Sequence, residues 1–486
     1  MHWKSDLNVL YVASECAPFV KTGGLADVVG AVPKALAEIG VHVKVVLPAY
    51  PALKEQIDEG EVVETYDDLH GGSARLVSVK AADLDLLLLD APHLFERPGN
   101  IYLNEEGQDW PDNHLRFGAL CKVATQVALY GTDNWKPSIV HAHDWQAGMV
   151  PLLIKLAQRD DAPKTVVTIH NIAFQGLFHW TTRELFDIPD NLFTHEGAEY
   201  YGHLGFLKSG LAFADKITTV SPTYAQELLT HEFGMGLEGL LQARQSDLVG
   251  ILNGIDTDVW NPSKDNVLPA PYSSRNRVNK RKSRDALEAR FGLTSDPESP
   301  LFCVISRLTE QKGLDLLLDA LPHLVAKGGR LALLGSGSTQ LEQGFRRAAE
   351  QFSGRVGVEI GYNEDLSHLM QAGSDAILVP SRFEPCGLTQ LYGLRYGTLP
   401  VVAETGGLAD TVVDASPANL KAKTATGIQM RPGNLDALKG AIDRTCELFG
   451  KPRVWKSLVG TAMRTPVGWE NSARKYHQLY QSLSAS

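Results

Sequence analysis

The chain has 486 residues, of which 44% are hydrophobic and 21% charged, the balance of a soluble globular protein. Its formal net charge of −11 argues against a general nucleic-acid or membrane-surface binder. The five cysteines form no C-x-x-C pair, so neither a disulfide framework nor a zinc site is indicated. No apolar run is long enough for a membrane span, and the first strand begins about seven residues in, which leaves no room for a signal peptide. We therefore expect a cytoplasmic protein with two large domains.

Strand-like runs alternate with helical patterns along almost the whole chain. In the first half the expected strands are 7–13, 41–47, 138–142, 165–169 and 217–220. In the second half they are 301–305, 330–334, 376–379 and 400–403. This alternation predicts the α/β class, with parallel sheets covered by helices on both faces. Ligands of such sheets bind beyond the carboxyl ends of the strands.

The sequence Thr-Gly-Gly-Leu-Ala-Asp occurs twice, at Thr22–Asp27 and Thr405–Asp410. Each copy lies between an expected strand and a helical pattern. Glycines at such a position let a ligand approach the backbone, and the amides of the helix N-terminus attract phosphate. A purely structural turn explains the repeat as well, so the functional interpretation is favoured mainly for the first copy. Lys21 precedes that copy and could neutralise a phosphate.

Further polar residues directly follow expected strands. They are His143-Asp144, His170-Asn171, Ser306-Arg307 and Ser381–Glu384. Arg307 and Lys312 could stabilise a departing diphosphate without a metal, although a surface salt-bridge cluster with Glu310 is the alternative. The spacings of the histidines match no common metal motif, so no metal is expected.

A turn shaped by Pro385 and Gly387 follows the strand at 376–379. It would expose the first amides of the next helix, and Glu384 would suit sugar hydroxyls better than phosphate. Cys386 is expected to be a packed residue rather than a nucleophile, because no base is evident.

Three segments bear on domain organisation. Turn residues around Asn253 predict a domain boundary there. The basic run Ser274–Arg284 is expected to be a solvated face or a mobile loop. Trp469–Leu483 predicts a helix whose Trp469, Ala473, Tyr476 and Tyr480 form one stripe, which could pack on either domain.

Taken together and in chain order, these motifs resemble the family of bacterial glycogen synthases, which is grouped with plant starch synthases. The motifs are Lys21–Leu25, His141–Trp145, Thr168–Asn171, Asn253–Asp256, Arg307–Gly313, Glu384–Leu388 and Thr405–Leu408. They extend over nearly the whole chain, and their combination is highly specific.

The resemblance implies the GT-B architecture, in which two Rossmann-like, doubly wound domains face each other across a deep cleft. It implies an acceptor-side domain at 1–252, a donor-side domain at 253–460 and a C-terminal helix at 461–486 that crosses back to the first domain. The implied reaction transfers glucose from ADP-glucose to the non-reducing 4-hydroxyl of an α-1,4-glucan such as glycogen, with retention of configuration. The resemblance implies no cofactor, no metal, and no nucleic-acid or membrane partner.

The resemblance also assigns roles to residues. The expected catalytic residues are Lys21, Asp144, His170, Arg307, Lys312 and Glu384. The expected donor-binding residues are Lys21, Gly23, Gly24, Asn171, Asn253, Arg307, Lys312, Cys386, Gly387, Leu388 and Thr389. Within this set, Arg307 and Lys312 would hold the phosphates and His170 would lie beside the glucose. Asp144 with Asn171 would line the sugar or acceptor side.

One position departs from the pattern of many retaining relatives. They carry a second glutamate eight positions after the first, associated with the ribose, whereas this chain has Tyr392. Ribose recognition is therefore unassigned. Two alternatives stay open: a transferase of the same fold that uses UDP-glucose or another acceptor, and a non-catalytic protein that binds nucleotide sugar or glucan. A dehydrogenase is disfavoured because no strand is followed by G-x-G-x-x-G.

Overall fold

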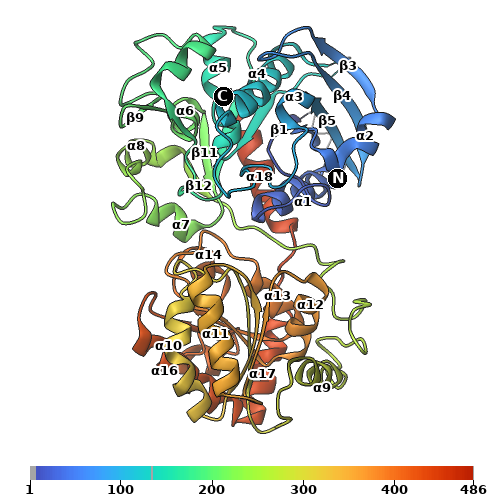
Figure 1. The fold of residues 1–486 in the computed structure, drawn as a ribbon, viewed down its shortest axis with the longest axis vertical. Helices are drawn as coiled ribbons and strands as arrows, with labels where there is room; N and C mark the ends of the chain where they lie inside the picture. Colours follow the sequence, from blue (N-terminus) through green and yellow to red (C-terminus); the bar gives the residue numbers. More distant parts are fainter. Residues whose placement is uncertain (1–6, 133–134, 485–486) are drawn as a thin grey trace. The chain divides into compact units, whose positions relative to one another are not determined.

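The structure is a computed structural model that describes residues 7–132 and 135–484 (Figure 1). The chain divides into two compact units, Met1–Asn253 with Trp469–Ser486, and Gly254–Gly468. The boundary thus falls directly after Asn253. The C-terminal segment joins the first unit from Trp469 rather than from residue 461, because residue 461 lies within α17 (Pro452–Ala462) of the second unit.

The first unit is built on a nine-stranded sheet. Its strands lie in the order β12 (Leu248–Gly250), β11 (Lys216–Thr219), β7 (Lys164–Ile169), β6 (Ile139–His143), β1 (Asn8–Val12), β2 (His42–Pro48), β5 (Leu84–Asp90), β4 (Ala74–Ala81) and β3 (Glu61–Tyr66). All neighbours are parallel except the pairs β5–β4 and β4–β3. Central strands such as β1 and β7 are buried along almost their whole length, as is typical of parallel strands that helices cover on both faces. The strand order reverses between β6 and β1, and this switch point is where such sheets bind ligands.

The second unit has a smaller, fully parallel sheet. Its strands lie in the order β15 (Val356–Ile360), β14 (Arg330–Gly335), β13 (Leu301–Ile305), β16 (Ala376–Val379), β17 (Leu399–Ala403) and β18 (Ile428–Met430). The switch point of this sheet lies between β13 and β16. The predicted strands 301–305 and 376–379 match β13 and β16 residue for residue.

Helices connect the strands in both units (Figure 1). Those of the first unit are α1 (Gly24–Ala37), α2 (Lys54–Glu59), α3 (Pro92–Phe95), α4 (Asn113–Tyr130), α5 (Val150–Leu156), α6 (Phe206–Phe213), α7 (Pro222–Glu227), α8 (Glu238–Ala243) and α18 (Glu470–Ser484). Those of the second unit are α9 (Lys280–Phe291), α10 (Leu314–Ala326), α11 (Thr339–Gln351), α12 (Glu364–Gly373), α13 (Thr389–Tyr396), α14 (Gly406–Thr411), α15 (Pro417–Ala422), α16 (Leu435–Phe449) and α17. A small antiparallel sheet lies between β7 and β11 in the chain. Its strands are β8 (Leu177–His179), β10 (His203–Gly205) and β9 (Glu199–Tyr200). Within the part of the chain that the structure describes, no helix has the length and apolarity needed to cross a bilayer.

The C-terminal helix α18 belongs to the first unit, where it packs against α1 (Figure 1). Its predicted stripe is buried, and this settles the alternative that the sequence left open. The Tyr480 hydroxyl lies 2.9 Å from the Tyr11 hydroxyl on β1 and 2.7 Å from His141 Nδ1 on β6. The last helix therefore reaches the centre of the first sheet.

The expectation of a solvated or mobile basic run at Ser274–Arg284 is wrong for Lys280 and Arg284, although Arg281 and Lys282 are exposed. Lys280 Nζ donates to the Ala372 carbonyl at 2.8 Å and to Thr398 Oγ1 at 2.9 Å, and Arg284 Nη1 lies 2.8 Å from Asp375. Burial lowers the pKa of Lys280 to about 7. The reason is that α9 packs against α12, and these two cations point toward carbonyls and a carboxylate on that side of α9. Charge density along the sequence does not reveal which face a charge occupies.

Candidate active site

A buried carboxylate organises the first glycine loop. Glu15, three residues after β1, is 3% exposed and accepts hydrogen bonds from the Thr22 amide at 2.5 Å and the Thr22 hydroxyl at 2.6 Å. It also accepts from the Gly23 amide at 3.1 Å and from the Tyr102 hydroxyl at 2.6 Å. The expectation that the loop amides are open to a ligand is therefore wrong for Thr22 and Gly23, because their donors already point to Glu15.

Lys21 lies on the outside of the same loop. Its Nζ is 2.7 Å from Asp27 in the first turn of α1, and its side chain is 42% exposed. An exposed ion pair of this kind is weak, so it leaves Lys21 able to exchange Asp27 for an anionic ligand.

Asp144 follows β6 in a strained backbone conformation, with φ 54° and ψ −168°. That region is populated almost only by glycine, and other residues held there cluster at functional sites. Asp144 Oδ1 accepts from the His170 amide at 2.7 Å. Burial raises the pKa of the Asp144 carboxyl to about 7, and the amides of His170 and Asn171 oppose that rise. The sequence expectation that these three residues lie together is met, because β6 and β7 are neighbours.

Three histidines contact one another in sequence at the ends of β6 and β7: His141 stacks on His143, and His143 meets His170. His143 Nδ1 is 3.0 Å from His170 Nε2, and the rings of His141 and His143 stack with centroids 4.3 Å apart. His141 also bonds Thr168 Oγ1 at 2.6 Å. Burial lowers the pKa of His141 and of His170 to about 3 and holds that of His143 well below its usual range.

In residues 7–132 and 135–484, no three or more His, Cys, Asp or Glu side chains are grouped so as to hold a metal ion. The expectation of a metal-independent reaction stays a prediction.

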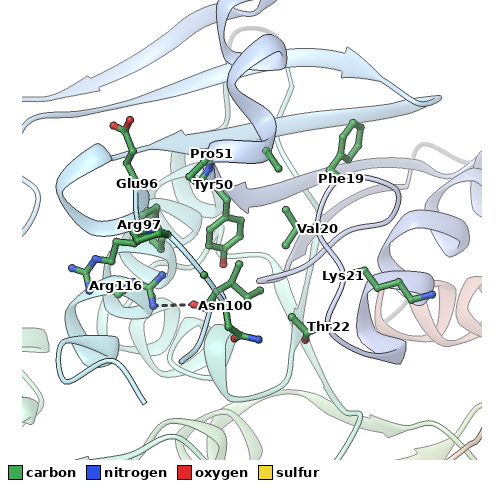
Figure 2. Close-up of a pocket in the computed structure, with 15 residues that line it drawn as sticks. Phe19, Val20, Lys21, Thr22, Tyr50, Pro51, Glu96, Arg97, Asn100 and Arg116 are labelled. Carbon is green, nitrogen blue, oxygen red and sulfur yellow. Dashed lines mark hydrogen bonds between the residues drawn. The ribbon is translucent and has the colours of Figure 1, made fainter. Parts of the chain in front are cut away.

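A pocket of about 610 Å³ opens beside the first glycine loop (Figure 2). It lies between residues 19–22, residues 50–52 and residues 95–101. The hydroxyl of Tyr50 is buried and makes no hydrogen bond to any described residue. In Figure 2 the side chain of Lys21 extends away from Tyr50. The volume is typical of a small-molecule site, and Lys21 and Thr22 belong to both the pocket and the loop.

In the second unit, an ion pair joins the two loops at the switch point. Lys312, from the loop after β13, pairs with Glu384, from the loop after β16, and both side chains are largely buried. Ser381 Oγ donates to the same Glu384 carboxylate at 3.1 Å. The sequence placed Lys312 against phosphate and Glu384 against sugar as separate residues, whereas the structure brings them into direct contact.

Two further features fix these loops to each other. The Arg382 amide donates to the Gln311 carbonyl at 2.8 Å, and the Arg382 guanidinium pairs with Asp315. At Gly313, where φ is 67°, a Cβ would lie 2.0 Å from the Pro380 carbonyl oxygen. Only glycine allows this approach, so the lysine that precedes it is held in place by backbone contact.

Arg307 is exposed at the end of β13. The alternative of a salt-bridge cluster with Glu310 is not realised: among the described residues no ion pair joins Arg307 to an acidic side chain. A cation at a switch point without an acidic partner is available for an anionic ligand.

The segment from Cys386 to Thr389 leads into α13, whose first helical residue is Thr389. Gly387 has a φ of 71°, and the Gln390 side chain donates to the carbonyls of Cys386 and Gly387. Helix geometry leaves the amides at this end without intrahelical acceptors. Cys386 is buried, and burial and packing are what the sequence predicted for it.

The second copy of the repeated hexapeptide packs against this loop. A Cβ at Gly406 would lie 2.0 Å from the Glu384 carbonyl oxygen, and one at Gly407 would lie 2.3 Å from the Cys386 carbonyl oxygen. The Gly407 amide donates to the carbonyls of Glu384 and Pro385. This copy therefore supports the loop that carries Glu384.

Two remaining candidates lie apart from these clusters. The ring of Tyr392 stacks on Trp260 with centroids 3.7 Å apart, so it is a packing residue in this structure.

Asn253 is the last residue of the first unit, and its side-chain oxygen is buried without a hydrogen-bond partner among the described residues. Its role in donor binding stays a prediction.

The sequence motifs did not indicate Glu15, Tyr102 or the contact of His143 with His170. The signal for Glu15 was present, because this residue follows an expected strand as His143 and Asp144 do. No sequence pattern indicates Tyr102, which lies in an irregular segment and reaches Glu15 only through the tertiary fold.

Comparisons with known proteins agree with this arrangement. Residues 8–243 match the family of the starch synthase catalytic domain, and residues 285–456 match glycosyl transferases group 1. The chain is 62% identical to a glycogen synthase of Roseobacter denitrificans, over 98% of this chain and 99% of the relative. It is 52% identical to a glycogen synthase of Rhodopseudomonas palustris, over 99% of both chains.

A solved structure extends the comparison. The catalytic domain of starch synthase IV from Arabidopsis thaliana, bound to ADP and acarbose, is 31% identical to this chain, with a TM-score of 0.89. The match covers 99% of this chain and all of that one. The two units are therefore Rossmann-like domains of the GT-B type, as predicted. The chain belongs to the glycogen synthase family and is a glycosyltransferase of glycogen synthesis.

Proposed function

We propose that the protein transfers glucose from ADP-glucose to the non-reducing 4-hydroxyl of an α-1,4-glucan, with retention of the anomeric configuration. The bacterial relatives named glycogen synthase support this activity, and the plant neighbour bound to ADP and acarbose supports the classes of donor and acceptor. The proposed partners are ADP-glucose, ADP and glycogen, and the proposed location is the cytoplasm.

The observation that carries the proposal is the Lys312–Glu384 pair at the switch point of the second unit, with Arg307 exposed on the same loop as Lys312. In the proposed reaction Lys312 and Arg307 bind the diphosphate and balance the charge that develops as it leaves. Glu384 and the amides of Gly387, Leu388 and Thr389 bind the glucose and the distal phosphate. Arg307 supplies a fork of donors that matches phosphate oxygens, and Lys312 supplies a compact charge.

Residues of the first unit act on the sugar and the acceptor in this proposal. His170 lies beside the glucose, Asp144 and Asn171 line the acceptor side, and Lys21 adds a cation to the donor beside Gly24. Because no enzyme nucleophile is evident, the acceptor hydroxyl attacks from the face that the diphosphate leaves, through an oxocarbenium-like state. A phosphate oxygen takes the hydroxyl proton, and the protein contributes position and charge stabilisation.

The test is a transfer assay with glycogen and labelled ADP-glucose or UDP-glucose, with a chelator present. We expect incorporation from ADP-glucose that the chelator does not reduce. Incorporation only from UDP-glucose, or only with added metal, would contradict the proposal.

Variants of the second unit test the assignment of roles. Lys312→Ala and Arg307→Ala should each lower turnover by about 10²–10³, the usual cost of losing one preorganised donor. Lys327→Ala is the control, because Lys327 is an exposed lysine next to the C-terminus of α10 and pairs with Asp443. Turnover near that of the unmodified enzyme in both Lys312→Ala and Arg307→Ala would remove these residues from the mechanism.

A further inference from the structure

His143 holds one nitrogen of His170 from a fully buried position. It is the last residue of β6 and is 0% exposed. Its ring contacts that of His141, with centroids 4.3 Å apart, and that of Tyr11, with centroids 4.8 Å apart, and these two rings also contact each other. These contacts fix the plane of the imidazole, so that Nδ1 meets His170 Nε2 at 3.0 Å.

Both rings are neutral near pH 7. Burial, with smaller contributions from His141 and His170, holds the pKa of His143 well below its usual range, and burial lowers the pKa of His170 to about 3. Two neutral imidazoles that share one hydrogen bond have a single proton between the two facing nitrogens. Either His143 donates from Nδ1, or His170 donates from Nε2.

The far nitrogen of His143 distinguishes the two arrangements. His143 Nε2 is buried and has no hydrogen-bond partner among the described residues. If His170 were the donor, His143 would carry its own proton on Nε2, which would be a buried N–H without an acceptor. Orphaned buried N–H groups are rarer than buried acceptors that lack a donor. The arrangement in which His143 donates from Nδ1 is therefore the favoured one.

The tautomer of His170 follows from this choice. If His170 Nε2 accepts the hydrogen bond, its proton must be on Nδ1. No described protein group is hydrogen-bonded to His170 Nδ1, and the residue is only partly buried. The neighbouring Asp144 accepts a hydrogen bond from the His170 amide, so the consecutive residues His143 and Asp144 hold the ring and the backbone of His170.

We propose that His143 is a positioning residue that holds His170 in the Nδ1–H tautomer, so that His170 presents a hydrogen-bond donor to a sugar hydroxyl and does not act as a base. The identity of the ligand rests on the proposed function. The tautomer rests on the geometry alone, so the two can fail separately.

Nitrogen-15 NMR of histidine-labelled protein tests the tautomer directly. Each ring is assigned by the loss of its signals in the variants His143→Asn and His170→Gln. In the unmodified enzyme we expect His170 Nδ1 to be protonated and His170 Nε2 to be a hydrogen-bonded acceptor. Protonated His170 Nε2 would overturn the proposal, whatever the enzyme's substrate proves to be.

Two substitutions at position 143 separate positioning from packing. His143→Leu fills similar space without a donor, whereas His143→Asn keeps an N–H near the place of Nδ1. We expect His143→Leu to lower kcat/KM for the donor about tenfold, the value of one oriented hydrogen bond, and to give a mixture of His170 tautomers. His143→Asn should restore the Nδ1–H tautomer and most of the activity.

Equal activity and an unchanged tautomer in His143→Leu would overturn the proposal. If His143→Leu fails to fold, the NMR spectrum of the unmodified enzyme and the behaviour of His143→Asn still decide it.

Discussion

The two copies of Thr-Gly-Gly-Leu-Ala-Asp share a sequence and a place at the start of a helix, yet their surroundings differ. At Gly23 and Gly24 of the first copy, a Cβ would meet nothing within 4 Å. At Gly406 and Gly407 of the second, it would lie 2.0 and 2.3 Å from carbonyl oxygens. The glycines of the first loop therefore lie beside open space, whereas those of the second loop are packed against backbone carbonyl groups.

The amides of the two copies are also satisfied differently. A side-chain carboxylate, Glu15, holds Thr22 and Gly23, whereas backbone carbonyls of Glu384 and Pro385 hold Gly407. The residue before the first copy is Lys21 and the residue before the second is Glu404. The comparison shows that a glycine pair can lie beside open space or in close backbone packing, and that only its surroundings decide between them.

We expect the largest difference between the two copies when a glycine of each is replaced by alanine. Gly406 has a φ of 45°, so Gly406→Ala combines an unfavourable backbone conformation with an overpacked contact, and we expect it to lower the free energy of unfolding by roughly 2–5 kcal/mol. The aligned Gly23→Ala has an extended backbone and open space, and we expect a change within about 0.5 kcal/mol. Chemical denaturation of both variants measures the difference. Equal losses would mean that the two loops are packed alike.

Removing the charge of Glu15 should loosen only the first copy. Glu15→Gln replaces a charged acceptor of several hydrogen bonds, which we expect to cost about 1.5–3 kcal/mol. Hydrogen exchange should quicken at the amides of Thr22 and Gly23 and stay unchanged at Gly407. Tyr102→Phe is the milder control, because it removes one of the donors to Glu15. Faster exchange at Gly407 would indicate general destabilisation instead.

The dependence of stability on pH should distinguish the two units. Among the described residues, Asp144 of the first unit is buried without an ion pair, whereas Glu384 of the second unit is paired with Lys312. A pKa raised from 3.8 to about 7 means that the folded state binds more protons than the unfolded state between those values. Stability from this group is therefore fully present below about pH 4 and is lost as the pH rises toward about 7.

Asp144→Asn should remove this dependence. The melting temperature of the variant relative to that of the unmodified enzyme should rise between about pH 5 and about pH 8. A constant difference across that range would show that Asp144 is ionised throughout.

The smallest effect on stability is expected at Lys21. Its exposed pair with Asp27 contributes little, so Lys21→Met should change the free energy of unfolding by less than about 0.5 kcal/mol. Turnover should nevertheless fall by about 10²–10³ if the lysine binds the donor. Glu404→Met at the aligned position is the control, and it should affect neither property. Unchanged turnover in Lys21→Met would remove the functional distinction between the copies.

The sequence by itself determined the α/β class, the strands that lead to both switch points and the buried face of α18. The spacing of apolar residues and the length of an apolar run indicate which segment is buried. For this reason the predicted bounds of β13 and β16 agree with the structure at both ends. Polar residues after the expected strands also predicted that Asp144 and His170 lie together, because parallel strands bring their carboxyl ends to one edge.

The tertiary structure alone decided which partners those residues meet. Lys312 and Glu384 are 72 positions apart, and His143 and His170 are 27 apart, and no local pattern encodes either contact. The same is true of Lys280. Its charge predicted a position in solvent, but its ammonium group donates a hydrogen bond to the Ala372 carbonyl on α12. Hydrogen bonds and ion pairs depend on distance and direction in space, and these are set only when separate strands and helices pack together.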